Sequence, residues 1–309
     1  MIILNLVVFL VFFVLLIKST DFSIKYSSRL ARTFHFPEFM VSFFIVAMIS
    51  VLPEAAISVI SAIKGQPELG LGTLLGSNIA DLTLVLGIVT LFSSKSVKVK
   101  SKILKNNFFY LILLLLPLIL GFDGSFSRLD GLILLSIGIA FFVKIYFEGK
   151  KFHKKNYKKR KIPKKSLFKN LLLLIISLAV LIFIAFFTVK FAINFANDVK
   201  LPVVLIGVTI LALGTCLPEL IFSILAIRKN HDDLALGDIL GTVITDATIV
   251  LGLVAIITPF SYNPYNIYVS GGAMFVAGSF VIMFMKSNRS ISKFEGLLLI
   301  FLYIFFILL

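Results

Sequence analysis

The chain has 309 residues, of which 59% are hydrophobic and 33 are phenylalanine. Too few polar residues remain to cover a water-soluble domain of this length, so the composition excludes that class and predicts a polytopic membrane protein. The formal net charge of +15 is compatible with nucleic-acid binding, but the distribution of basic residues described below favours another explanation. The single cysteine, Cys216, excludes internal disulfides and thiolate metal clusters.

Ten apolar segments approach the length of about 20 residues that a helix needs to cross the hydrocarbon core. We expect spans at about 2–17, 38–63, 70–93, 107–121, 129–147, 168–190, 202–227, 235–258, 266–285 and 294–309. Runs such as LILLLLPLIL lack the alternation of a membrane β-barrel, so the predicted fold class is an all-α integral membrane protein with ten transmembrane helices. The first segment has no basic leader and no small-residue cleavage site, so we interpret it as a retained span.

Basic residues gather in alternate loops between these spans. Of the 30 lysine and arginine residues, 25 lie in 18–32, 95–105, 150–169, 228–229 and 286–293. The positive-inside rule places these loops in the cytoplasm, which leaves both termini outside the cell and makes a plasma membrane the default location. We interpret residues 149–168 as a basic cytoplasmic connector that touches anionic lipid headgroups, and we expect no nucleic-acid partner.

The chain repeats itself at a separation of 165 residues. Leu52-Pro53-Glu54 recurs as Leu217-Pro218-Glu219, and Asp81 recurs as Asp246. Between 42–89 and 207–254, 19 of 48 positions are identical, and the shared Pro, Glu, Asp, Gly and Lys residues do not come from apolar bias.

This repetition predicts the domain organisation. We expect a first repeat at 1–148 with spans 1–5, the connector at 149–168, and a second repeat at 169–309 with spans 6–10. Because five is an odd number, the second copy enters the membrane from the opposite side, so the two copies are inverted five-helix repeats. Secondary transporters commonly place a midplane site between inverted halves, although a channel can share this plan.

Four acidic residues fall well inside predicted spans: Glu54, Asp81, Glu219 and Asp246. One charge at mid-membrane costs roughly 2.5–3.5 kcal/mol on insertion scales, so protons or cations must neutralise them. The alternative is pairing with buried basic residues, but the second, third, seventh and eighth spans carry lysine and arginine only at their ends. We therefore favour cation binding.

Neutral oxygen ligands accompany these acids. Pro53 and Pro218 lack an N–H and free the carbonyls of Ile49 and Gly214 four residues earlier. Hydroxyl residues recur on the acidic helix faces, namely Ser50, Ser58, Ser77, Thr215, Ser223 and Thr242. Carboxylate, carbonyl and hydroxyl oxygens suit calcium, and subsets of them suit sodium, whereas zinc and copper fit poorly. Glycines at 72, 76, 237 and 241 form small-xxx-small faces, which we expect to let these helices pack closely.

The segments SVLPE…GSNIAD and GTCLPE…GTVITD resemble the two α-repeat motifs of the cation/calcium exchangers, especially the prokaryotic and archaeal sodium/calcium exchangers. The resemblance covers nearly the whole chain. It implies that Glu54 and Glu219 bind calcium directly, together with backbone oxygens at Ser50 and Thr215. It also implies a set of sodium ligands besides the two glutamates, made up of carbonyls near Ala47 and Ala212 and groups at Ser77 and Thr242. It further implies alternating access by sliding of the first and sixth spans, with no cofactor and no required oligomer.

Three positions depart from the family pattern. Val51 and Cys216 each replace a hydroxyl residue before Leu-Pro-Glu, which weakens sodium sites that use it. Asp81 stands where many such exchangers have asparagine, and Asp246 adds a further acid nearby, so we expect strong proton competition for the site.

The leading interpretation is thus a calcium antiporter driven by sodium. Its rivals are a proton/calcium or other cation antiporter and, less favoured, a cation channel whose flux shows no counter-ion dependence. An enzyme is not expected, because the buried acids lack a paired histidine, a serine nucleophile or an HExxH motif.

Overall fold

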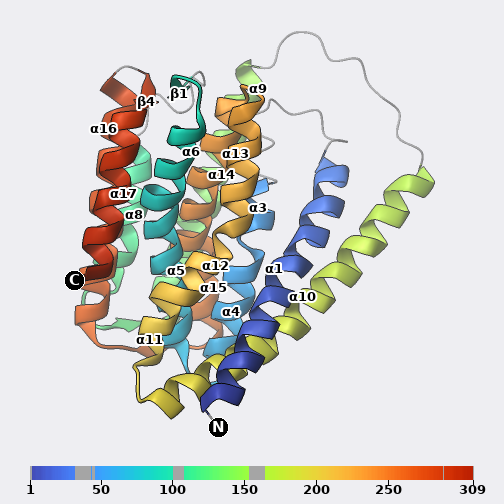
Figure 1. Ribbon diagram of the computed structural model, residues 1–309, viewed down its shortest axis with the longest axis vertical. Coiled ribbons are helices and arrows are strands. Elements are labelled where there is room, and N and C mark those ends of the chain that lie inside the picture. Colours follow the sequence, from blue (N-terminus) through green and yellow to red (C-terminus); the bar gives the residue numbers. More distant parts are fainter. Residues whose placement is uncertain are drawn as a thin grey trace.

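The computed structural model describes residues 2–31, 43, 46–99, 108–152, 164–287 and 289–308, and they form a bundle of helices (Figure 1). The first half contains α1 (Ile2–Ala31), α3 (Ala47–Ser50), α4 (Leu52–Ile63), α5 (Pro67–Ala80), η2 (Asp81–Val85), α6 (Leu86–Phe92), α8 (Phe108–Leu120) and α9 (Arg128–Phe152). The second half contains α10 (Lys164–Val199), α11 (Val203–Ile206), η3 (Gly207–Leu211), α12 (Ala212–Thr215), α13 (Leu217–Arg228), α14 (Asp232–Ile244), η4 (Thr245–Val250), α15 (Leu251–Ile257), α16 (Pro264–Ser287) and α17 (Lys293–Leu308). The segments η2, η3 and η4 are π-helical.

Within the described residues, six helices are long and apolar enough to cross a membrane: Pro67–Phe92, Arg128–Phe147, Phe168–Val199, Val203–Arg228, Asp232–Ile257 and Tyr268–Ser287. Three shorter apolar helices occupy other expected spans, at Ile2–Leu16, Leu52–Ile63 and Phe109–Leu120, and α17 occupies the last. Of the second expected span, the structure describes residues 43 and 46–63, where the apolar helix Leu52–Ile63 follows the interruption at Val51. The chain is a multi-pass helical membrane protein.

Two helices extend beyond the apolar runs that predicted them. The first continues to Ala31, and α10 runs from Lys164 to Val199. Backbone hydrogen bonding continues past the point where hydropathy ends, so hydropathy alone underestimates both lengths. Of the expected connector at 149–168, α9 includes residues up to Phe152 and α10 begins at Lys164, and residues 153–163 lie outside the described part of the chain.

The interrupted helices of the two halves match residue for residue at the separation of 165. Val51 separates α3 from α4, and Cys216 separates α12 from α13 at the equivalent place. Each Leu-Pro-Glu therefore opens a new helix, with proline in the first turn, where its missing N–H costs nothing. The interruption lies two residues before each proline.

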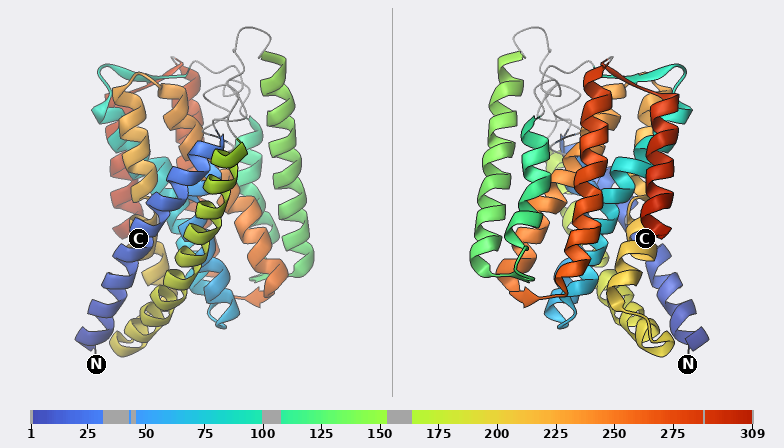
Figure 2. Two further views of the ribbon diagram at one scale, coloured as in Figure 1. Left: turned by 90° about the vertical axis from the view of Figure 1, so that its right-hand side faces the viewer. Right: turned by 90° about the vertical axis from the view of Figure 1, so that its left-hand side faces the viewer.

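Two short strand pairs join the halves. Strand β1 (Ser96–Lys98) pairs antiparallel with β4 (Ser290–Ser292), with Val97 opposite Ile291. Strand β2 (Ser125–Phe126) pairs antiparallel with β3 (Phe260–Ser261). The two pairs lie at opposite ends of the bundle (Figures 1 and 2). Each half thus contributes one strand at each end.

Glycines bring helices of opposite halves into backbone contact. A Cβ atom on Gly76 of α5 would lie 2.6 Å from the carbonyl oxygen of Val208 in η3. A Cβ atom on Gly241 of α14 would lie 2.7 Å from the Cβ of Ala47 in α3. The close packing expected of these glycines is confirmed, and it holds α5 and α14 against the interrupted helix of the other half.

The helices α1 and α10 form a separate oblique pair along one side of the bundle (Figures 1 and 2). Their shared interface belongs to a second hydrophobic cluster, which includes Phe9, Leu16, Leu181 and Ala185 and is distinct from the main core. This pair contacts the bundle through apolar side chains, and Phe13 of α1 packs against Gly214 of α12.

Candidate functional site

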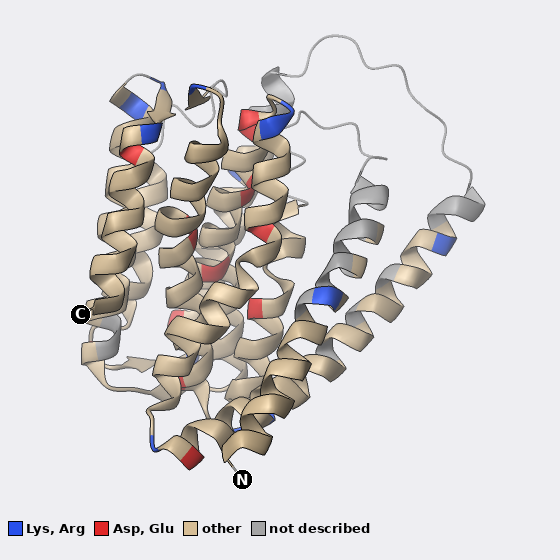
Figure 3. Ribbon diagram, in the orientation of Figure 1, with Lys and Arg blue, Asp and Glu red and all other residues tan. Residues whose placement is uncertain are grey.

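The four acids singled out from the sequence all lie inside the bundle. Glu54, Asp81, Glu219 and Asp246 have side chains that are 0% exposed. Acidic residues occur along the middle of the bundle, whereas basic residues gather mainly at the end that carries β1 and β4 (Figure 3). The charge distribution therefore separates an anionic interior from a cationic end.

Glu54 and Glu219 occupy equivalent places in the two interrupted helices. Each lies in the first turn of its helix, α4 or α13, directly after the break. The N-terminus of a helix stabilises a negative charge, so the break offsets part of the cost of burying these carboxylates. None of their four carboxylate oxygens makes a direct hydrogen bond to a described residue, but the Thr215 side chain interacts with Glu54, and the two glutamates interact electrostatically. Both glutamates are thus left with free ligand oxygens.

Asp81 and Asp246 lie in the π-helical segments η2 and η4. Such segments are frequent at functional sites because they shift side chains out of the regular helical register. Asp246 accepts a hydrogen bond of 3.4 Å from the Ser77 hydroxyl, across the boundary between the halves. Among the described residues, neither oxygen of Asp81 makes a direct hydrogen bond, but the Cys216 thiol interacts with Asp81, and both aspartates interact electrostatically with Glu54.

The neutral ligands that the resemblance implies differ in whether their oxygen atoms already accept or make hydrogen bonds. The Ala47 carbonyl accepts the N–H of Val51 at 3.1 Å. The Ala212 carbonyl accepts the N–H of Cys216 at 3.2 Å and the Thr215 hydroxyl at 3.1 Å. The hydroxyl of Thr242 is buried and has no hydrogen-bond partner among the described residues. Its oxygen is therefore a free ligand.

The acids are not gathered into one compact metal centre. Within the described residues, no group of three or more His, Cys, Asp or Glu side chains is arranged to hold a metal ion. An ion bound by these carboxylates in this arrangement therefore needs neutral oxygens from the same helices as additional ligands. Calcium and sodium accept such mixed oxygen shells.

A fifth buried acid, Asp238, was not singled out from the sequence. Its side chain is 0% exposed and accepts a hydrogen bond of 3.3 Å from the hydroxyl of Ser50. It lies near the beginning of the eighth expected span, at 235–258, and not in its middle. The signal that was missed is spacing, because Asp238, Thr242 and Asp246 follow one another at intervals of four on one helix face.

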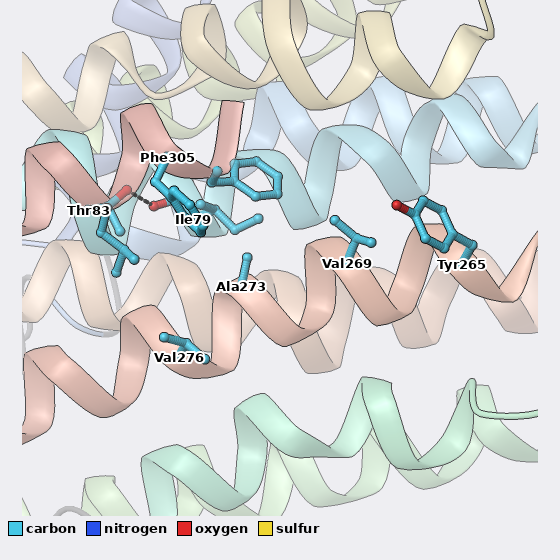
Figure 4. Close-up of a pocket in the computed structure, with 9 residues that line it drawn as sticks. Ile79, Thr83, Tyr265, Val269, Ala273, Val276 and Phe305 are labelled. Atoms are coloured by element: carbon cyan, nitrogen blue, oxygen red, sulfur yellow. Dashed lines mark hydrogen bonds between the residues drawn. The ribbon is translucent and has the colours of Figure 1, made fainter. Parts of the chain in front are cut away.

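An apolar pocket of about 280 Å³ lies between α5, η2, α16 and α17, and its lining includes Ile79 and Thr83 but none of these acids (Figure 4). Apart from Thr83 and Tyr265, its lining side chains are hydrocarbon. The Thr83 hydroxyl is already bonded to the carbonyl of Ile79. This pocket carries no acidic ligand, so the buried carboxylates remain the candidate ion site.

Comparison with known proteins places this architecture in a family. The sequence matches the sodium/calcium exchanger protein family over residues 4–147 and 169–309. It is 30% identical to the inner membrane protein YrbG of Escherichia coli, over 81% of this chain and 79% of that protein. It is 24% identical to the sodium/calcium exchanger MaX1 of Methanosarcina acetivorans, over 99% of this chain and 98% of that protein.

A solved structure of the sodium-calcium exchanger NCX_Mj, soaked with 10 mM Na+ and zero Ca2+, has a similar fold. It superimposes with a TM-score of 0.70 and 26% identity, covering 99% of this chain and 98% of NCX_Mj. Sequence and structure therefore agree that the chain belongs to the sodium/calcium exchanger family, as a cation/calcium antiporter with several membrane-spanning helices.

Proposed function

We propose that this protein exchanges calcium for sodium across a membrane by alternating access. The observation that carries the proposal is the pair Glu54 and Glu219. Both are buried, both follow a helix break, and their carboxylate oxygens have no hydrogen-bond partner among the described residues. Two such carboxylates neutralise one calcium ion, and the same two carboxylates can hold sodium instead. Competition of the two ions for one ligand pair is the coupling mechanism.

The remaining ligands are assigned around this pair. Calcium uses the backbone oxygens at Ser50 and Thr215. Sodium uses the carbonyls at Ala47 and Ala212 with the groups at Ser77 and Thr242. Asp81 and Asp246 complete the anionic shell. The hydrogen bond from Ser77 to Asp246 supports this assignment, since it joins ligands from both halves.

The proposed topology has ten transmembrane helices in two inverted five-helix repeats, at 1–148 and 169–309. Its support is the recurrence of the interrupted helices at 165 residues and the placement of one strand from each half at each end of the bundle. The basic end faces the cytoplasm of a plasma membrane, and both chain termini face outside. The connector at 149–168 then lies beside anionic lipid headgroups.

A second candidate is exchange of calcium or another cation for protons. Asp81 favours it, because a fourth buried carboxylate without a hydrogen-bond partner among the described residues can carry a proton in one step of the cycle. Both candidates use the same helices and differ in the coupling ion.

The test is calcium uptake into proteoliposomes that contain the purified protein. An outward sodium gradient is compared with an outward proton gradient and with no gradient. We expect uptake that needs the sodium gradient and is lost in Glu54→Gln. The matched control is Glu68→Gln at the start of α5, which removes an acid that lies outside the buried set and should leave uptake unchanged. Uptake driven by protons alone contradicts the sodium proposal and supports the second candidate, and flux without counter-ion dependence contradicts both.

A further inference from the structure

The buried acid Asp238 breaks the match between the two halves. Its equivalent in the first half is Thr73, whose hydroxyl donates a hydrogen bond of 2.8 Å to the carbonyl of Leu69 in its own helix. Thr73 is therefore satisfied locally and carries no charge. Asp238 keeps one carboxylate oxygen, Oδ2, without a hydrogen-bond partner among the described residues.

Asp238 lies on the same helix as Asp246 but is displaced from it toward one end of the bundle. It lies two helical turns before Asp246 on α14 and η4, or about 12 Å at 1.5 Å per residue. That direction leads toward the basic turn at Arg228 and Lys229, after which α14 begins. Asp238 also interacts electrostatically with Asp81 and Glu219.

Two hydroxyl groups accompany Asp238: that of Ser50 is hydrogen-bonded to it, and that of Thr242 lies one turn away on the same helix face. Ser50, from the interrupted helix of the first half, donates its hydroxyl hydrogen to Asp238 and keeps its own lone pairs. Thr242 lies one turn further along the same face of α14, with its hydroxyl buried and unpartnered among the described residues. A buried carboxylate and a buried hydroxyl left without partners are costly, and a bound cation offsets that cost.

We propose that Asp238, with the hydroxyls of Ser50 and Thr242, forms an accessory binding position for the transported cation between the central glutamates and the basic end of the protein. The inference rests on the proposed exchange function and assigns a site to it. The position exists on one side only, because Thr73 offers no free ligand on the other. Calcium arriving from the basic end is held there before it reaches Glu54 and Glu219.

The experiment measures the calcium dependence of sodium-driven transport separately from each face, in proteoliposomes whose protein is oriented by a cleavable terminal tag. We expect Asp238→Asn to raise the calcium concentration for half-maximal transport about tenfold from the basic face, the size of one lost charged contact. From the opposite face the change should stay below about twofold. Asp238→Glu should keep most of the wild-type affinity, and Thr73→Val should change neither face.

Equilibrium binding of 45Ca2+ to the detergent-purified full chain provides a second readout. We expect Asp238→Asn to weaken binding while the protein stays monodisperse. Equal effects at both faces, or none at either, overturn the accessory position and leave calcium/sodium exchange standing. Wild-type protein that neither binds 45Ca2+ nor transports it overturns the exchange function itself, and the accessory position with it. If Asp238→Asn fails to fold, the face-specific calcium affinity of Ser50→Ala decides the question, because this variant removes the hydroxyl that contacts Asp238 and keeps the backbone oxygen at Ser50. An unchanged value at the basic face then overturns the proposal.

Discussion

The two halves of the chain agree at the helix breaks and diverge beside them. Glu54 and Glu219 occupy the same first-turn position, and both are completely buried. Two helical turns before Asp81, the first half has Thr73. Two helical turns before Asp246, the second half has Asp238. A central site that serves both faces needs ligands from both halves, whereas each approach to it serves one face. The comparison indicates that the central ligands must match between the two halves, whereas the residues between the centre and each face need not match.

The largest expected effect comes from substituting either of the two equivalent glutamates. Glu54→Gln and Glu219→Gln should each lower sodium-driven calcium uptake by about 100-fold or more, because in the proposed exchange each removes one of the two charges for which the ions compete. The measurement is initial uptake into proteoliposomes at saturating calcium. If either single variant keeps most of its activity, the two glutamates do not act as an equivalent pair.

The glycine contacts are the next test, since they hold each acid-bearing helix against the other half. Gly76→Ala places a Cβ atom against the Val208 carbonyl and should lower the free energy of unfolding by about 1–3 kcal/mol. The matched control is Gly272→Ala in α16, where no atom lies within 4 Å of the added Cβ. That variant should gain up to about 1 kcal/mol from helix propensity. Thermal unfolding in detergent measures both, and equal shifts would contradict the packing argument.

A smaller effect is expected from restoring hydroxyls at the two breaks. Val51→Ser and Cys216→Ser, combined, should raise the apparent sodium affinity about three- to tenfold, because each adds an oxygen beside a glutamate. At present the Cys216 thiol lies 3.5 Å from the carbonyl oxygen of Ser77 and is a weak donor to it. Sodium dependence of calcium efflux is the measurement. The control is Cys216→Ala, which adds no oxygen and should not raise the affinity.

The smallest effect concerns a difference between the strand connections. Tyr262, which follows β3, donates a hydrogen bond of 2.6 Å to the carbonyl of Gly121, whereas its equivalent in the first half is the apolar Val97. Burial, with Asp123 nearby, raises the pKa of Tyr262, so the hydroxyl keeps its proton and remains a donor at neutral pH. Tyr262→Phe should cost about 0.5–1.5 kcal/mol of unfolding free energy at unchanged transport. A loss of transport with unchanged stability would contradict a purely structural role.

The sequence predicted the features that depend on chemistry within one segment. The two prolines mark the positions of the breaks. Glu54 and Glu219 stand out as buried acids because acidic residues are rare in apolar spans. It did not predict features that depend on partners far along the chain. The strand pairs are only two or three residues long, which is too short for an alternating pattern to predict a strand. Asp238 was not singled out, because only the fold brings Ser50 to it.

The same limit applies to the long oblique helices. Apolar runs predicted spans at 2–17 and 168–190, but helical structure continues to Ala31 and to Val199. Charged and polar residues in those extensions lower the mean hydropathy, so the extensions are not predicted as part of a span. Packing of α1 against α10 supplies the support that hydropathy does not record.

The strand pairs also bear on how the chain is made. On a ribosome, Ser96–Lys98 and Ser125–Phe126 emerge long before Ser290–Ser292 and Phe260–Ser261, with which they pair. Until then, the strands of the amino-terminal half have no partner strand. The segments that pack against its glycines are also synthesised later. Contacts between segments so distant in sequence form late. Assembly of this protein is consequently completed by its last-synthesised helices, and truncation near the carboxyl end should leave the first half inserted but unassembled.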